Sequence, residues 1–134
     1  MYQVDIAAAA RASDAFRRVL HTTEHVQLVV MTLQPGEDIG AEVHEHNDQV
    51  LSFVVGTVRA EVAGQVSEVG SGDVVVVPAG TEHNFTNVGT GPARLYTLYA
   101  PPDHAPDTVH QTKADAVHDE HDVPPPPDEI SPTD

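Results

Sequence analysis

The stretch GDVVVVPAGTEHNFTN, residues 72–87, decides the fold of this chain. Its four consecutive valines, residues 74–77, predict a buried strand, because β-branched apolar side chains favour a covered, pleated backbone. Pro78 and Gly80 mark a turn that ends this strand. A single imidazole, that of His83, follows at the start of the next strand. The pattern therefore predicts that a rigid strand and a tight turn aim His83 into the interior.

The rest of the chain is built from short strands separated by Gly or Pro about every 8–12 residues. We expect strands over residues 16–21, 25–33, 50–55, 57–62, 66–69, 74–77, from His83 onward, and 93–100. Asp5 is placed to cap a short helix over residues 6–11. Because no helical period separates the strands, the sequence predicts an antiparallel all-β sandwich or barrel rather than a parallel α/β fold.

Composition excludes several classes of partner and of site. The chain has 21 acidic and 6 basic residues, a formal net charge of −15, so neither nucleic acid nor an anionic membrane is an expected partner. The absence of cysteine excludes disulfides, thiolate catalysis and cysteine-based zinc sites. No leader-like or membrane-spanning apolar run is present, so we expect a soluble cytoplasmic protein.

The character of the chain changes after residue 100, where most of its 11 prolines lie. We expect one β domain over residues 1–113 with a short amino-terminal extension. Residues 114–134 are acidic and proline-rich, and we expect them to form a disordered tail, because they cannot bury enough apolar surface to offset the entropy of ordering. His104 and His110 could line the barrel opening, but packing at the surface is the expected role.

Four side chains are candidate metal ligands. His44 and His46 are two residues apart in what reads as extended chain, which places both imidazoles on one face. Gln49 follows a tight turn, and His83 arrives from a different hairpin. Three imidazoles and one amide oxygen that converge inside a barrel predict a divalent transition-metal site with open positions. Glu42 shares the parity of His44 and is a candidate catalytic base.

The pattern Gly72-x5-Pro78-x-Gly80-x2-His83-x3-Asn87 resembles the second motif of the cupin superfamily at every fixed position. The pattern His44-x-His46 followed by Gln49-x6-Gly56 resembles the first cupin motif. It departs from that motif in having Gln for the usual Glu, a shorter gap before it, and no leading glycine at the usual distance.

Residues 16–113 further resemble compact, single-domain bacterial cupins. The resemblance is carried by the segments 35–40, 48–49, 101–104 and 108–113. It implies a double-stranded β-helix (jelly roll), often a homodimer formed by sheet-to-sheet packing, and a divalent metal such as manganese, iron, nickel or zinc. It implies no single reaction. With His44, His46, Gln49 and His83 as ligands the shell is neutral, which leaves the ion its full charge and favours an anionic substrate.

Each functional interpretation has a structural alternative. The histidines could be barrel residues bonded to backbone groups, Gln49 could donate a hydrogen bond that orients a ligand, and Glu42 could simply be solvated. Two functions follow from the sequence. One is a metal-dependent enzyme, dioxygenase-like or isomerase-like, acting on a small oxygen-rich or anionic molecule in the barrel. The other is a non-catalytic module that binds or stores a small ligand or metal.

Overall fold

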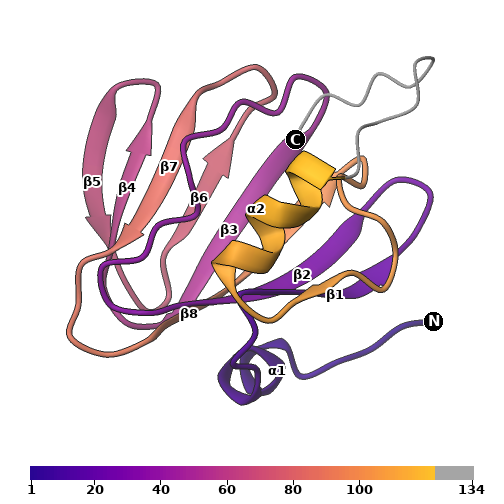
Figure 1. The fold of residues 1–134 in the computed structure, drawn as a ribbon, viewed down its shortest axis with the longest axis horizontal. Coiled ribbons are helices and arrows are strands. Elements are labelled where there is room, and N and C mark those ends of the chain that lie inside the picture. The colour runs from indigo at the N-terminus through magenta and orange to yellow at the C-terminus, as the bar shows by residue number, and fades with distance from the viewer. Residues whose placement is uncertain (123–134) are drawn as a thin grey trace.

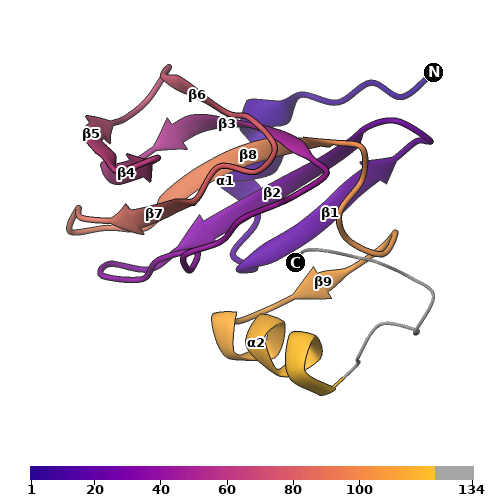
Figure 2. The same ribbon diagram turned by 90° about the horizontal axis from the view of Figure 1, so that it is seen from above.

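The computed structural model describes residues 1–122, which form two antiparallel sheets with a helix near each end (Figure 1). The elements are α1 (Ile6–Ala12), β1 (Arg17–Thr22), β2 (Gln27–Leu33), β3 (Asp48–Val55), β4 (Val58–Val62), β5 (Gln65–Val69), β6 (Val74–Val77), β7 (His83–Asn87), β8 (Ala93–Ala100), β9 (Val109–His110) and α2 (Lys113–Asp122). One sheet has the order β6-β3-β8-β2-β1-β9 and the other β5-β4-β7 (Figure 2). This is the predicted all-β double-stranded β-helix.

The short amino-terminal helix is confirmed. The Asp5 side chain accepts a hydrogen bond of 3.1 Å from the Ala8 N–H, which satisfies one of the free donors of the first turn. Neither this helix nor α2 is long and apolar enough to cross a membrane, and residues 1–122 contain no other α-helix.

The core lies between the two sheets and follows the alternation of the strands. Along β8, Leu95, Thr97 and Tyr99 are buried, whereas Tyr96 on the opposite face is only half-buried. Of the two tyrosines of this strand, only Tyr99 therefore faces inward. The rings of Phe53 and Phe85, one from each sheet, lie 5.9 Å apart between centroids. Each such fully buried side chain contributes about 1.5–3 kcal/mol of hydrophobic stabilisation.

The valine strand is in place, but the prediction that it is buried is wrong for half of its residues. Val74 is 58% exposed and Val76 is 61% exposed, while Val77 is 2% exposed. The reason is that β6 is an edge strand of an antiparallel sheet. Only one face of such a sheet covers the core, so alternate valines meet solvent.

Gly56, the glycine of the first motif, is required by close packing. Its φ is +97°, and a Cβ at this position would lie 2.9 Å from the Cα of Ala93. A larger residue would have to displace backbone here, so the end of β3 can turn toward β4 only with glycine.

The carboxyl-terminal segment corrects the expectation of a disordered tail from residue 114. Residues 113–122 form α2, which begins with reciprocal hydrogen bonds: Asp115 N–H donates to Thr112 Oγ1 at 3.1 Å and Thr112 N–H to Asp115 Oδ2 at 3.2 Å. Ala116 packs into the core, and Lys113 pairs with Asp38. The acidic composition of this segment gives no indication of the apolar contact that Ala116 makes with the core. Residues 123–134 of the predicted tail lie outside the described residues.

Helix α2 offers a test of this docking. Ala116 is 3% exposed and its neighbour Val117 is 43% exposed. We expect Ala116→Asp to lower the free energy of unfolding by about 1–3 kcal/mol, because it places an unpaired charge against the core. Val117→Asp adds the same charge to the same helix and is expected to change stability by less than about 0.5 kcal/mol. Urea unfolding of both variants checks this; equal effects would show that α2 is not docked.

Candidate metal centre

Glu42, His44 and His83 meet inside the barrel. Each offers one ligand atom, and the three atoms lie within 4.8 Å of one another. Glu42 Oε1 is 3.2 Å from His44 Nε2 and 3.9 Å from His83 Nε2. Both histidines are 3% exposed, and Glu42 is half-buried. One carboxylate oxygen therefore lies between two buried imidazole nitrogens.

Backbone hydrogen bonds hold these side chains together, although His83 comes 39 positions after His44 in the sequence. The Glu42 N–H donates to the His83 carbonyl at 2.9 Å, and the His83 N–H donates to the Glu42 carbonyl at 3.0 Å. The Gly80 N–H donates to the His44 carbonyl at 2.9 Å. The turn before His83 thus fixes the backbone of His44, although residues 38–47 form no strand of their own.

The ring of His83 is held in an orientation that suits a metal ligand. Its Nδ1 lies 2.9 Å from the Thr81 carbonyl, which can accept only from an N–H, so the Nδ1 carries the proton. Its Nε2 then holds a lone pair, is buried, and has no hydrogen-bond partner within the described residues. Burial lowers the pKa of His83, which keeps the ring neutral. A neutral imidazole with a free Nε2 is the form that binds a metal ion.

His44 lies between two carboxylates. Glu42 is 3.2 Å from its Nε2, and Asp103 Oδ1 is 3.6 Å from its Nδ1. Burial alone lowers the pKa of His44, but the two carboxylates outweigh burial and raise it to about 10. The two carboxylates, one near each ring nitrogen, therefore favour a positive charge at this ring.

Gln49 lies inside the barrel, as its place on β3 requires. It is 1% exposed, and its Nε2 donates to Thr97 Oγ1 at 3.0 Å. Its Oε1 is buried and has no hydrogen-bond partner among residues 1–122. The amide thus supports Thr97 while presenting a free acceptor, so a ligand role for Gln49 stays a prediction.

His46 is the predicted ligand that the structure does not bring to the centre. It is exposed and does not belong to the cluster of Glu42, His44 and His83. The chain bends at residues 45–46, so the extended alternation that was expected to align His46 with His44 ends before it. Glu42, which precedes this bend, retains the parity of His44.

Asp103 and His104 adjoin the centre; Asp103 is not among the residues predicted from the sequence, and surface packing was the expected role of His104. The side chain of Asp103 is 4% exposed, and that of His104 is 15% exposed and lies with its ring centroid 5.1 Å from that of Tyr99. Burial and the charge of Arg17 lower the pKa of His104 to about 3, so this ring is neutral. The sequence signal was the Pro-Pro-x-His pattern at residues 101–104, which was assigned to the domain of residues 1–113 but not to its metal site.

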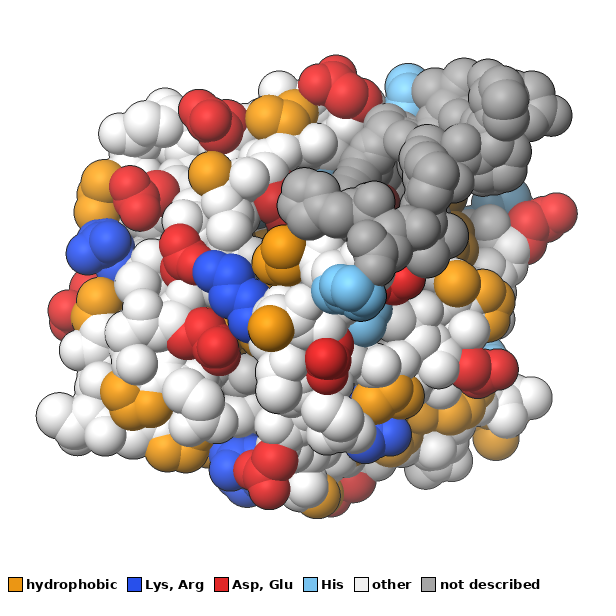
Figure 3. Space-filling view, in the orientation of Figure 1, with side chains coloured by type: hydrophobic (Ala, Val, Ile, Leu, Met, Phe, Trp, Pro, Cys, Tyr) orange, Lys and Arg blue, Asp and Glu red, His pale blue; other side chains and the backbone are white. Residues whose placement is uncertain are grey.

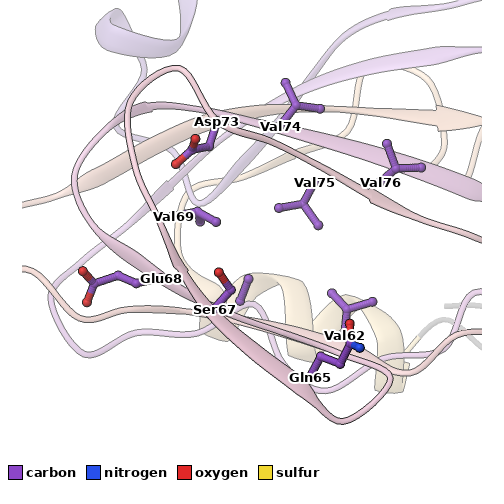
Figure 4. Close-up of a pocket in the computed structure, with 10 residues that line it drawn as sticks. Val62, Gln65, Ser67, Glu68, Val69, Asp73, Val74, Val75 and Val76 are labelled. Atoms are coloured by element: carbon purple, nitrogen blue, oxygen red, sulfur yellow. The ribbon is translucent and has the colours of Figure 1, made fainter.

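Two cavities lie near the cluster, one lined in part by His83 and the other by its cross-strand partner Val62. One of about 250 Å³ is lined by Ala41, Glu61, Gly64, Glu82, His83 and Asn84. The other, of about 400 Å³, lies between β5 and β6 and is lined by Ala60, Val62, Gln65, Ser67, Glu68, Val69 and residues 73–76 (Figure 4). Val62 is the cross-strand partner of His83, so this cavity begins beside the cluster.

The lining of both cavities is apolar and acidic. Val62, Val69 and Val75 pack against the core and turn into the larger space (Figure 4). Carboxylates occur in both linings, and no Lys or Arg of residues 1–122 lines either. Acidic side chains also outnumber basic ones on the face shown in Figure 3. The walls of both cavities therefore carry negative charge.

Comparisons with known proteins agree with this architecture. The sequence profile of the family described as cupin domain matches residues 29–99. YrkC, an uncharacterised protein of Bacillus subtilis, is 40% identical over 122 residues, which cover 87% of this chain and 66% of YrkC. The chain thus spans about two thirds of the length of that relative.

Solved structures give the same result. The crystal structure of BH2720 from Bacillus halodurans has a TM-score of 0.86 and 40% identity, over 87% of this chain and 92% of that one. A predicted oxalate decarboxylase of Thermotoga maritima has a TM-score of 0.56 and 20% identity, over 59% of this chain and 69% of that one. This last likeness shows the fold alone.

The placement of the histidines makes a sharp prediction. We expect His44→Ala and His83→Ala each to weaken Zn²⁺ binding at least as much as the roughly 10- to 100-fold typical of losing a residue that only supports a ligand. His46→Ala, a matched change in the same segment, should leave the dissociation constant unchanged because its ring is exposed. Competition with a chromophoric chelator measures all three; a loss in His46→Ala equal to that in His44→Ala would refute this cluster.

Proposed function

The chain belongs to the cupin domain family, and from that premise we propose that it is a metal-dependent enzyme of the oxygenase type. We assign the metal to Glu42, His44 and His83 and the substrate to the adjoining cavities. The observation that carries the proposal is the donor set, two imidazoles and one carboxylate within 4.8 Å. That set, with further positions open, is the ligand arrangement of non-haem iron oxygenases.

The donor atoms fit a cation. His83 Nε2 and Gln49 Oε1 are buried acceptors with no hydrogen-bond partner in the described part of the chain. Buried polar atoms are nearly always paired, so unpaired acceptors beside a carboxylate suit a positive ion. A divalent ion bound there (iron, manganese, nickel or zinc) would supply Lewis acidity, with redox chemistry added if it is iron or manganese. Gln49 is a fourth candidate donor.

The position of Glu42 favours the oxygenase over the isomerase. An isomerase of this design needs Glu42 as a free base that takes a proton from the substrate. Its Oε1 instead lies 3.2 Å and 3.9 Å from the Nε2 atoms of His44 and His83. At this position the carboxylate can bind the same metal ion as the two imidazoles. A carboxylate that holds the ion is not free to act as that base.

The charge of the centre points to an uncharged substrate. The sequence-based preference for an anion assumed a neutral ligand shell, whereas Glu42 brings one negative charge to the ion. The cavities add Glu61 and Glu82 on one side and Glu68 and Asp73 on the other, with no basic residue of the described chain among them. We therefore propose a small, oxygen-rich, uncharged molecule that an apolar wall can hold.

A non-catalytic binding or storage module is the second candidate. The observation that favours it is the apolar part of the larger cavity's wall, where Val62, Val69 and Val75 offer no polar group to orient a reacting molecule. Such a cavity can hold a ligand without positioning it for reaction. The two candidates share the metal centre and differ only in turnover.

Metal analysis and oxygen uptake separate the two candidates. The protein is purified without added metal, its metal content is measured, and oxygen consumption is followed with a panel of small hydroxylated, uncharged compounds. Stoichiometric iron and substrate-dependent oxygen uptake are the expected results. Stoichiometric metal without turnover of any compound would favour storage, and absence of binding of manganese, iron, nickel and zinc alike would refute both.

Glu42 provides a second test with a control from the same segment. We expect Glu42→Gln to weaken metal binding by about tenfold or more, since it removes the one charged donor, and to abolish oxygen uptake. Glu45→Gln removes an equal charge from an exposed position and should leave both properties unchanged. Retention of full metal affinity in Glu42→Gln would show that the carboxylate is not a ligand.

A further inference from the structure

We propose, on the basis of the metal centre proposed above, that Asp103 is the positioning residue that fixes the ring of His44 from behind. Asp103 is not a ligand in this scheme. It lies in the connection between β8 and β9, beyond residues 29–99 that match the family profile. The barrel motifs alone therefore do not complete the centre.

The contact between the two side chains carries the proposal. Asp103 Oδ1 is 3.6 Å from His44 Nδ1, and the side chains are 4% and 3% exposed. Within residues 1–122 His44 Nδ1 has no hydrogen-bond partner at shorter distance. A buried ring N–H needs an acceptor, and Asp103 is the carboxylate placed to be that acceptor. A proton held on Nδ1 leaves Nε2, the atom that faces Glu42, to bind the ion.

The barrel clamps the backbone of Asp103 in place. Gln27 on β2 is fully buried, and its Oε1 accepts hydrogen bonds from the Asp103 N–H at 3.2 Å and the His104 N–H at 3.0 Å. Its Nε2 donates to the His104 carbonyl at 2.7 Å. Asn47, which is 4% exposed, donates through Nδ2 to the Pro101 carbonyl at 2.5 Å. The buried side-chain amides of Gln27 and Asn47 thus fix the backbone of residues 101–104 near His44.

A purely structural role is the rival explanation. The Asp103 carboxylate also lies 3.5 Å from His104 Nε2, and Arg17, a buried cation, acts on it. Asp103 could therefore serve only to neutralise Arg17. The two roles differ in what they affect: neutralising Arg17 changes the stability of the metal-free protein, whereas positioning His44 changes metal affinity and the state of its ring.

The test measures Zn²⁺ and Co²⁺ affinity in Asp103→Ala and Asp103→Asn. We expect the dissociation constant of Asp103→Ala to rise about 10- to 100-fold, and that of Asp103→Asn to rise less, because the amide oxygen still accepts from Nδ1–H. Asp107→Asn is the matched control. It removes one charge from an exposed position in the same segment, at a φ of 66° that asparagine tolerates, and should change nothing.

Two further measurements separate the possible results. Thermal unfolding of the metal-free variants reports the structural role, and the nitrogen-bound proton resonance of His44 Nδ1 reports the positioning. We expect this resonance in the parent protein and its loss or shift in Asp103→Ala. Unchanged affinity and an unchanged resonance in Asp103→Ala, with or without lower thermal stability, would overturn the positioning role.

The proposed function and this inference can fail separately. If the parent protein binds none of manganese, iron, cobalt, nickel and zinc, the proposed function fails, while the Nδ1 resonance of the metal-free protein still decides whether Asp103 holds His44. If the parent binds metal and Asp103→Ala binds it equally well, only the inference fails. Gln27→Met, which removes the clamp, should weaken binding in the same direction; full affinity there would show that the clamp is not needed.

Discussion

Two backbone hydrogen bonds between Glu42 and His83 join the two halves of the site. Residues 38–47 belong to no strand, and this bridge fixes them against β7. Everything else at the centre follows from it: Glu42 and His44 take the inner face, the turn at Gly80 meets the His44 carbonyl, and a carboxylate reaches both imidazoles. Because side chains on a paired backbone have few freedoms, the ligand atoms are held before any ion binds.

The interior of the barrel is divided into an apolar and a polar end. Phe53 and Phe85 fill the first, while His44, Gln49 and Tyr99 occupy the second. Buried polar groups lower stability unless they are paired. Some of them are paired, as Gln49 Nε2 is with Thr97 Oγ1. The buried acceptors His83 Nε2 and Gln49 Oε1 have no hydrogen-bond partner among residues 1–122. A polar end that destabilises the fold in this way is best explained by a function that uses it.

Much of the fold could be predicted because strand, turn and ligand are encoded locally. Residues 72–87 contain the strand, the Pro and Gly of the turn and His83 in one continuous segment, so a short pattern suffices. The position of His46 could not be predicted this way, since the pattern His44-x-His46 does not reveal the bend at residues 45–46. The exposure of Val74 depends on β6 being an edge strand, which is a property of the whole sheet. Helix α2 was hidden by a composition that suggests disorder, and no motif singled out Asp103 within residues 101–113.

The central position of β8 has a consequence for how the protein is made. β8 lies between β3 and β2, so neither strand has its full set of hydrogen bonds until residues 93–100 arrive. These are pairings between segments far apart in sequence, which form slowly. While the chain is being synthesised, the first 90 or so residues expose two unpaired strand edges, a state prone to aggregation. The barrel can therefore close only after β8 has been synthesised and has paired with both neighbours.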